Sequence, residues 1–354
     1  MFRSLLIVFV LLLPAPALAA RDVLREQSAR TVEVAGLRGL RVENSRGDVH
    51  ASASADGRIH VTALKVVHSN SRAESRRMAN EIHVDTSTEG GQLVVRALYP
   101  ARRSIRIGFW DLFHDMEWPS SEVKILVQVP AGLGLAVRTS SGDIDCEGLA
   151  SPVRIESTSG DIHIAAARGD IDVTTSSGDV TAGDVGRARI RTTSGDAGLT
   201  TVRGPLDVHT TSGDVTVHDA ADSLTLGTVS GDVEVERAAL GLSLTTTSGE
   251  IRARRVRGRV DVGASSGGVE LGLVSPLTSA EVSTGSGDIE LTFERGMSAR
   301  LELQTSNGQL QMESPIQVLS LTRRRVTGQL RQGGAVVSLR SASGDIHVLT
   351  GEGS

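Results

Sequence analysis

The amino-acid sequence predicts an all-β chain wound as a parallel β-solenoid of about 18-residue coils, with a mixed β-rich cap at its N-terminus. The first observation is a Ser-Gly-Asp motif that recurs at a nearly constant spacing, 18 residues from Gly195 to Gly213. The second is that apolar and polar residues alternate on both sides of each motif, which is the period of a β-strand. The third is a composition of 39 glycines and only 2% aromatic residues. A thin repetitive core needs few aromatic side chains, so the composition also favours stacked coils.

Residues 1–20 are predicted to be a signal peptide. Arg3 precedes an apolar stretch, Pro14 ends that stretch, and Ala17-Leu18-Ala19 supplies a small-x-small cleavage site. The alternative is a transmembrane anchor, but the stretch is shorter than the roughly 20 residues that cross a bilayer. We therefore expect an exported protein that is periplasmic, secreted or held at the cell surface.

Residues 21–130 are predicted to form the N-terminal β-rich cap. Within them, Ser71-Arg72-Ala73-Glu74 is a capping box that opens a short helix. The segment from Glu81 to Tyr99 is predicted to be a hairpin that turns at Glu89-Gly90-Gly91. An isolated Arg46-Gly47-Asp48 motif indicates one early coil. A cap is expected because the exposed terminal strands of a solenoid invite aggregation.

Aromatic residues are concentrated at one place in the cap. Past the predicted signal peptide there are six, and five of them lie within residues 99–118. Such a cluster is typical of an exposed recognition loop or a membrane-surface contact, or of a cap folded over apolar core. The candidate partner contacts are Phe109, Trp110, Phe113 and Trp118.

Residues 131–354 are predicted to form the Ser-Gly-Asp solenoid, in which each coil contributes two short strands. Stacking pairs each strand with its equivalent in the next coil, about 4.8 Å away. An antiparallel β-sandwich is the alternative fold, but it does not require such regular spacing. The predicted core columns are Val137, Ile155, Val173, Ile190, Val208, Leu226, Leu244, Val262 and Val282 before the corner, and Ile144, Ile162, Val180, Ala197, Val215, Val233, Ile251, Val269 and Ile289 after it.

The Ser-Gly-Asp corner has a predicted role for each residue. Glycine supplies the positive φ of a tight turn. The hydroxyls before it, such as Thr210 and Ser212, are expected to point inward and to form ladders between coils. The aspartates stack in one column, with two interpretations: a solvated column that bonds the turn backbone, or a calcium site between coils. Glu250 and Gly268 interrupt this column, which consists of Asp143, Asp161, Asp179, Asp196, Asp214 and Asp232.

Charge and motifs exclude several functional classes. A formal net charge of -5 argues against a nucleic-acid binder. Cys146 is the only cysteine, so no intramolecular disulfide is possible, and a small buried residue is a better interpretation than a thiol nucleophile. Coils of 17–18 residues between Gly142 and Gly267 leave no room for loops that wall a catalytic cleft. We expect no enzymatic activity and no cofactor. The run Arg323-Arg324-Arg325 is either a solvated face or a contact for anionic glycan or lipid headgroups.

The layout resembles a bacterial family of exported β-strand-repeat proteins of unknown function that carry the label adhesin by analogy. The resemblance is carried by Arg46-Gly47-Asp48-Val49, by the Val127-Gln128-Val129-Pro130 lead-in, by the repeated units and by the closing Ser343-Gly344-Asp345-Ile346-His347-Val348. It implies the repeat architecture and supplies no catalytic residues. We expect an exported scaffold or adhesin-like envelope protein that presents repetitive faces to an envelope protein or a glycan. The alternative is a polysaccharide-binding or polysaccharide-cleaving β-helix enzyme.

Overall fold

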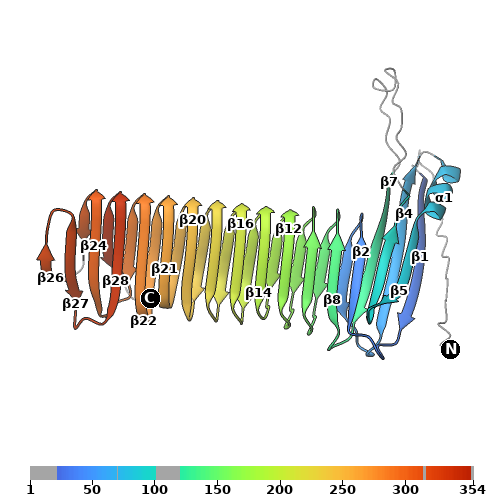
Figure 1. Ribbon diagram of the computed structural model, residues 1–354, viewed down its shortest axis with the longest axis horizontal. Helices are drawn as coiled ribbons and strands as arrows, with labels where there is room; N and C mark the ends of the chain where they lie inside the picture. Colours follow the sequence, from blue (N-terminus) through green and yellow to red (C-terminus); the bar gives the residue numbers. More distant parts are fainter. Residues whose placement is uncertain (1–21, 70, 101–119, 314–315, 352–354) are drawn as a thin grey trace, which may run out of the picture. The chain divides into compact units, whose positions relative to one another are not determined.

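The structure, a computed structural model, describes residues 22–69, 71–100, 120–313 and 316–351 (Figure 1). The predicted signal peptide and the four candidate aromatic contacts lie outside these residues. The chain divides into two compact units, residues 1–163 and residues 164–354. Helix α1 (Arg72–Glu81) is the only helix within the described ranges, and it is not long and apolar enough to cross a membrane.

Unit 1 contains coils that are far apart in the sequence and adjacent in space. Its strands are β1 (Asp22–Val32), β2 (Gly39–Asn44), β3 (Val49–Ala53), β4 (Ile59–Ser69), β5 (His83–Glu89), β6 (Gln92–Leu98), β7 (Ser120–Val129), β8 (Gly134–Thr139), β9 (Ile144–Glu147), β10 (Val153–Ser157) and, at the unit boundary, β11 (Ile162–Ala165). The β2–β3 coil pairs in parallel with the β8–β9 coil, with Leu40 opposite Leu135 and Val49 opposite Ile144. The isolated motif at Gly47 is therefore a coil in register with the repeats.

The remaining elements of unit 1 extend the walls of this coil. β6 pairs in parallel with β2 and forms an antiparallel hairpin with β5. Gly90 and Gly91 adopt positive φ at the turn, which confirms the predicted hairpin. The hydroxyl of Ser71 accepts a hydrogen bond from the Glu74 amide at 3.3 Å, which confirms the predicted helix start. On the other wall, β4 lies between β1 and β7 and is antiparallel to both.

Unit 2 is a parallel β-solenoid. Its strands are β12 (Ile171–Ser177), β13 (Val180–Gly183), β14 (Ala188–Ser194), β15 (Ala197–Val202), β16 (Leu206–Ser212), β17 (Val215–Ala220), β18 (Leu224–Ser230), β19 (Val233–Ala238), β20 (Gly241–Ser248), β21 (Ile251–Ser266), β22 (Val269–Ser286), β23 (Ile289–Phe293), β24 (Ala299–Asn307), β25 (Leu310–Met312), β26 (Ile316–Leu321), β27 (Arg325–Leu330), β28 (Ala335–Ser343) and β29 (Ile346–Thr350). Val208 lies opposite Leu226, and Val215 opposite Val233, in parallel register. The predicted fold class and its same-direction stacking are confirmed.

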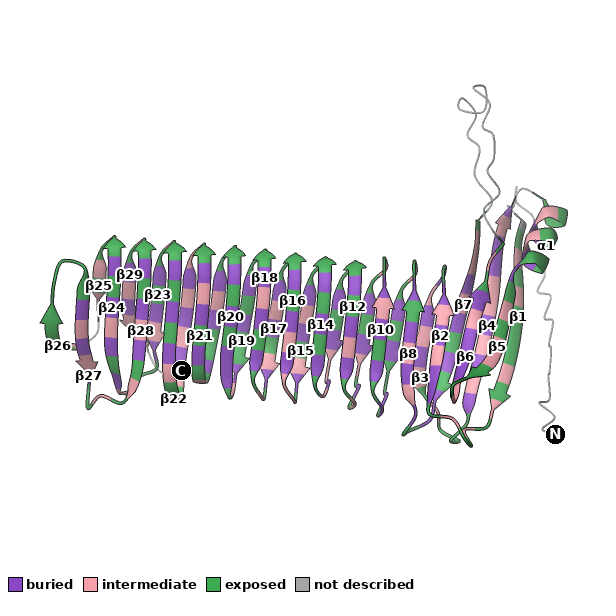
Figure 2. Cartoon of the chain, viewed as in Figure 1, coloured by how far each residue is buried: buried purple, intermediate pink, exposed green. Residues whose placement is uncertain are grey.

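Burial in unit 2 follows the predicted alternation, except at the serines. Val208 and Val215 are completely buried, and their equivalents in neighbouring coils are also buried. Buried and exposed residues alternate along the strands of unit 2 in Figure 2. Thr210 is buried, as expected, but Ser212 is exposed. The prediction that both hydroxyls point inward is therefore wrong for the serine, because the strand leaves its alternating pattern one residue before the glycine. Among the residues of unit 2 that the structure describes, no ladder between hydroxyls forms either. The buried hydroxyls bond main-chain carbonyls where they are paired, as Thr175 does with Ser177 at 3.0 Å.

The glycines of the corner are required by geometry. Gly213 has φ of 148°, and a Cβ built there would lie 2.2 Å from the carbonyl oxygen of Gly195. The same close approach recurs at Gly231 and Gly249. Any side chain would therefore meet both backbone strain and the backbone of the neighbouring coil.

The C-terminal end of unit 2 is interleaved. β28 lies between β22 and β24, and β29 lies between β23 and β25. The Gly287 amide donates to the Ser343 carbonyl at 2.9 Å, and the Gly344 amide donates to the Asn307 carbonyl at 3.1 Å. The last coil of the sequence is therefore inserted between two earlier ones. Beyond β24 the wall ends in two antiparallel strands, first β27 and then β26.

Candidate functional site

The aspartate column forms a ladder of side-chain to main-chain hydrogen bonds. In unit 2 the Asp214 amide donates to Oδ1 of Asp196, and the Asp232 amide donates to Oδ1 of Asp214, both at 2.8 Å. The Glu250 amide continues the series onto Asp232, also at 2.8 Å. The remaining predicted members make the same contact within their own units, namely Asp196 to Asp179 at 2.9 Å, Asp161 to Asp143 at 3.0 Å and Asp143 to Asp48 at 3.3 Å.

The backbone explains why a carboxylate is needed at this position. The next amide, that of Val215, donates to the carbonyl of Asp232 at 2.9 Å, so ordinary main-chain pairing resumes directly after the corner. At the glycine turn, the amide of the aspartate has no main-chain carbonyl to donate to, and the carboxylate of the neighbouring coil accepts its hydrogen bond instead. Each carboxylate is exposed, so water screens the like-charge repulsion to about 1 kcal/mol per neighbour. These contacts favour the solvated-column interpretation, and calcium binding remains a hypothesis.

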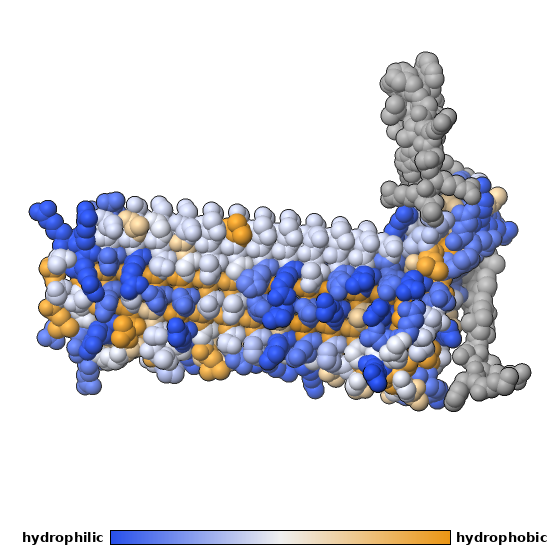
Figure 3. Space-filling model, viewed as in Figure 1, coloured by the Kyte–Doolittle hydropathy of each residue, from blue (hydrophilic) through white to orange (hydrophobic). Residues whose placement is uncertain are grey.

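A row of exposed serines runs beside the aspartates. In unit 2 the strands β12, β14, β16, β18, β20, β21, β22 and β28 place these serines directly opposite one another. We call this row, together with the aspartates across the glycine, the Ser-Gly-Asp edge. The serine side of the edge appears as an evenly spaced pale band in Figure 3. Its serines are Ser177, Ser194, Ser212, Ser230, Ser248, Ser266, Ser286 and Ser343. Sequence reasoning found these residues but assigned them to the interior.

Gly268 interrupts the ladder and leaves a hollow on the surface of unit 2. The hollow has a volume of about 190 Å³ and is open to solvent. Arg252 contacts Glu250 across its rim and lies 3.8 Å from Glu270. Across the parts of the chain that the structure describes, no group of three or more His, Cys, Asp or Glu side chains is arranged to hold a metal ion. The other lining residues are Ile251, Val269, Asp288 and Glu290.

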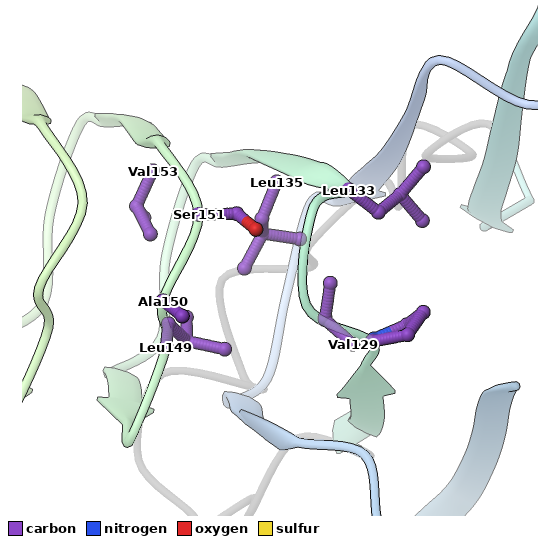
Figure 4. Close-up of a pocket in the computed structure, with 8 residues that line it drawn as sticks. Val129, Leu133, Leu135, Leu149, Ala150, Ser151 and Val153 are labelled. Atoms are coloured by element: carbon purple, nitrogen blue, oxygen red, sulfur yellow. The ribbon is translucent and has the colours of Figure 1, made fainter. Parts of the chain in front are cut away.

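A second cavity, in unit 1, is too small for a ligand. It has a volume of about 10 Å³ and lies under the corner that joins β7 to β8 (Figure 4). Leu133, Leu135 and Leu149 are among its apolar walls, and its one polar side chain, Ser151, accepts a hydrogen bond from the Gly132 amide at 2.8 Å. Since a single water molecule already needs about 10 to 15 Å³, this cavity has no room for a larger ligand.

Two titratable side chains in unit 1, one partly buried and one fully buried, have structural roles. The Tyr99 hydroxyl donates to the Arg46 carbonyl and accepts from the Val123 amide at 3.0 Å, so it ties β7 to the first coil. Burial raises the pKa of Tyr99 to about 12. Burial also raises the pKa of Cys146 to about 12, so its thiol stays neutral and is a poor nucleophile. Cys146 is a buried strand residue, as predicted.

A family model described as Toastrack DUF4097 matches residues 37–241 and again residues 237–349. The chain belongs to this family. The two Toastrack matches cover the β2–β3 coil and the repeats, and they confirm the family resemblance inferred from the motifs. Comparison with the curated proteins finds no match.

Solved structures give distant similarities to this Toastrack chain. A protein from Parabacteroides distasonis, provisionally named lipid binding, is 13% identical with a TM-score of 0.35, covering 91% of this chain and 96% of that one. A provisionally named adhesin from Bacteroides fragilis is 12% identical with a TM-score of 0.30, covering 92% and 97%. A provisionally named cell adhesion protein from Clostridium sporogenes is 6% identical with a TM-score of 0.25, covering 92% and 100%.

Proposed function

We propose that this Toastrack chain is a non-enzymatic exported scaffold, adhesin-like in action, that presents the Ser-Gly-Asp edge to a repetitive glycan or protein of the cell envelope. The observation that carries the proposal is the in-register row of exposed serines in unit 2. Parallel stacking repeats one hydroxyl and one carboxylate about every 4.8 Å. A polymer with regularly spaced polar groups can contact many coils, and weak contacts then add up to useful avidity.

The lateral faces of unit 2 are less suited to this role, because their charges already pair with one another. Arg189 contacts Asp207 and Arg237 contacts Asp219, each at 3.0 Å and each between neighbouring coils. Within the described residues, the hydroxyl groups of Ser194 and Ser212 have no such partners. An incoming glycan or peptide would therefore not need to displace intramolecular bonds from these hydroxyls.

Export and domain roles belong to the same proposal. Residues 1–20 would direct export to the periplasm, the cell surface or the medium, residues 21–130 would cap the repeats, and residues 131–354 would present the edge. The four candidate aromatic contacts, Phe109, Trp110, Phe113 and Trp118, would add a partner contact. Support comes from the sequence patterns alone. Immunoblotting of fractionated cells would test the location, and chain found in the cytoplasm would contradict it.

The test of the edge is a binding assay with matched variants. A glycan array and a set of purified envelope proteins are probed with the mature chain and with a variant carrying Ser194→Ala, Ser212→Ala and Ser230→Ala. The control carries alanine at the exposed threonines of the lateral faces, Thr181, Thr200 and Thr225. We expect loss of binding in the serine variant alone. Equal binding by all three proteins would remove the edge from the proposal, and release of reducing sugar would favour the polysaccharide-cleaving alternative.

A further inference from the structure

The last strand of the C-terminal wall in unit 2 has an open edge. Among the described residues, β26 pairs only with β27, and the pairing is antiparallel. The backbone amides and carbonyls on its other edge therefore have no strand partner. An edge of this kind is a template for a further strand unless charges, proline or a covering segment block it.

Apolar side chains of β26 are exposed to solvent, although they lie on the core face of the wall. Ile316 lies opposite Leu330, and Leu321 lies opposite Val326. Opposite residues of an antiparallel pair point to the same face of the sheet. Leu330 and Val326 are 3% and 1% exposed, so this face is the core face of the wall. Leu321 is nevertheless 70% exposed.

The same exposure extends along the strand. Val318, opposite Gly328, is 46% exposed, and Leu319, at the register shift, is 57% exposed. The apolar surface of the solenoid therefore continues past its last covered strand into solvent. The orange atoms at the end of unit 2 in Figure 3 belong to this region.

One edge strand of unit 1 shows the contrast. Among the described residues, β1 pairs only with β4, and it carries Arg25, Glu26 and Arg30 along its length. Charges of this kind discourage edge-to-edge pairing. β26, with the sequence Ile-Gln-Val-Leu-Ser-Leu, has none. Of these two edge strands, only β26 lacks this protection.

We infer that β26 pairs antiparallel with β26 of a second copy of this chain. One register matches both faces: Ile316 lies opposite Leu321 of the partner subunit, and Gln317 lies opposite Ser320 of the partner subunit. Apolar core-face residues then meet each other, and so do the polar residues of the outer face. Val318 lies opposite Leu319 of the partner subunit, at the centre of the pair.

Charge selects the antiparallel direction. The turn after β26 carries Arg323 and Arg324, and Arg325 opens β27 directly after it; all three are exposed. An antiparallel pair sends the two arginine turns to opposite ends, whereas a parallel pair would bring them together. A lipid surface fits less well than a second copy, because an open strand edge in hydrocarbon leaves its amides and carbonyls without partners.

Sedimentation velocity of the mature chain at increasing concentration tests the pairing. The test variant is Val318→Lys with Leu321→Lys. The control is Leu240→Lys, because Leu240 is a 63% exposed leucine elsewhere in unit 2. We expect dimers for the native chain and the control, and monomers with an unchanged circular dichroism spectrum for the double variant. A native chain that stays monomeric, or a double variant that still dimerises, would overturn the inference. So would a monomer that binds anionic vesicles through these two residues.

Crosslinking tests the register. Cys146 is buried and does not compete, so single cysteines can be introduced on β26. A mixture of Val318→Cys and Leu319→Cys chains should form the disulfide between unlike chains faster than either chain does alone. Equal rates in all three samples would exclude the stated register.

Discussion

The Asp232 amide donates to Oδ1 of Asp214 over 2.8 Å, and the two residues belong to neighbouring coils. In the sequence, the aspartate column predicts repulsion between like charges. In the structure, its carboxylates replace main-chain carbonyls as hydrogen-bond acceptors. The carboxylate accepts at the single position where the glycine turn removes the ordinary acceptor. This relationship allows the column to be tested one atom at a time.

Replacing Asp214 with alanine should remove the acceptor of the Asp232 amide. We expect the free energy of unfolding to fall by about 1 kcal/mol, the usual net value of such a hydrogen bond at an exposed site. Asp214→Asn retains an oxygen at the same place and should lose less than half as much. Urea unfolding followed by circular dichroism measures both. Equal losses in the two variants would mean that the charge, and not the acceptor, carries the effect.

Calcium should have no effect on the melting temperature of the mature chain. The ladder already uses one oxygen of Asp179, Asp196, Asp214 and Asp232. A ligand stabilises a fold only if it binds the native state. The measurement compares melting in millimolar calcium with melting in EDTA. A rise in melting temperature with calcium that is lost in Asp196→Asn would instead support the metal interpretation of the column.

Gly213→Ala should strongly destabilise unit 2. The new Cβ would lie 2.2 Å from the Gly195 carbonyl oxygen, on a backbone with φ of 148°. Backbone strain and overpacking should together lower the free energy of unfolding by about 3 kcal/mol. Gly263→Ala is the matched control, because Gly263 also lies in the solenoid but its Cβ would meet nothing nearer than 3.9 Å. We expect the control to change stability by less than about 0.5 kcal/mol. Similar unfolding curves for the two variants would contradict the stacked-glycine geometry.

The ion pair between Glu43 and Arg96 in unit 1 should make stability depend on pH. The Arg96 guanidinium, 2.6 Å from the carboxylate, lowers the pKa of Glu43 below its usual 4.5. A lowered folded-state pKa gives a contribution that is present above pH 4.5 and is lost as pH falls through the folded-state value. The melting temperature of Arg96→Met should therefore fall less steeply than that of the native chain below pH 4.5. Parallel curves for the two proteins would exclude this contribution.

The core was predictable from the sequence because each coil repeats the same constraint. Apolar residues equivalent to Val208 and Val215 recur at fixed positions in successive coils, and period-two alternation determines which face they occupy. The glycine corner was predictable for the same reason, because only glycine tolerates its φ.

The outward direction of the serines and the order of the coils were not predictable in this way. Alternation holds up to Thr210 and then breaks, and nothing in the residues around Ser212 shows where it breaks. Periodicity identifies a segment as a coil, but it does not say which coil lies next to it. Thus Gly47 stacks on the coil of Gly142, and Gly344 lies between Gly287 and Gly308. These neighbours are decided by long-range strand pairing. The hollow at Gly268 could have been predicted from the sequence, because a glycine stands there in place of the column aspartate.

The interleaved end of unit 2 restricts the order in which the chain can be assembled. Synthesis delivers β24 before β28, yet β24 is held in the solenoid through β28. The solenoid therefore cannot add its coils strictly in the order of the sequence, because β24 can dock only after β28 has been synthesised. A chain cut just before Ala335 would lack β28, so β22 and β24 would each be left with an unpaired edge.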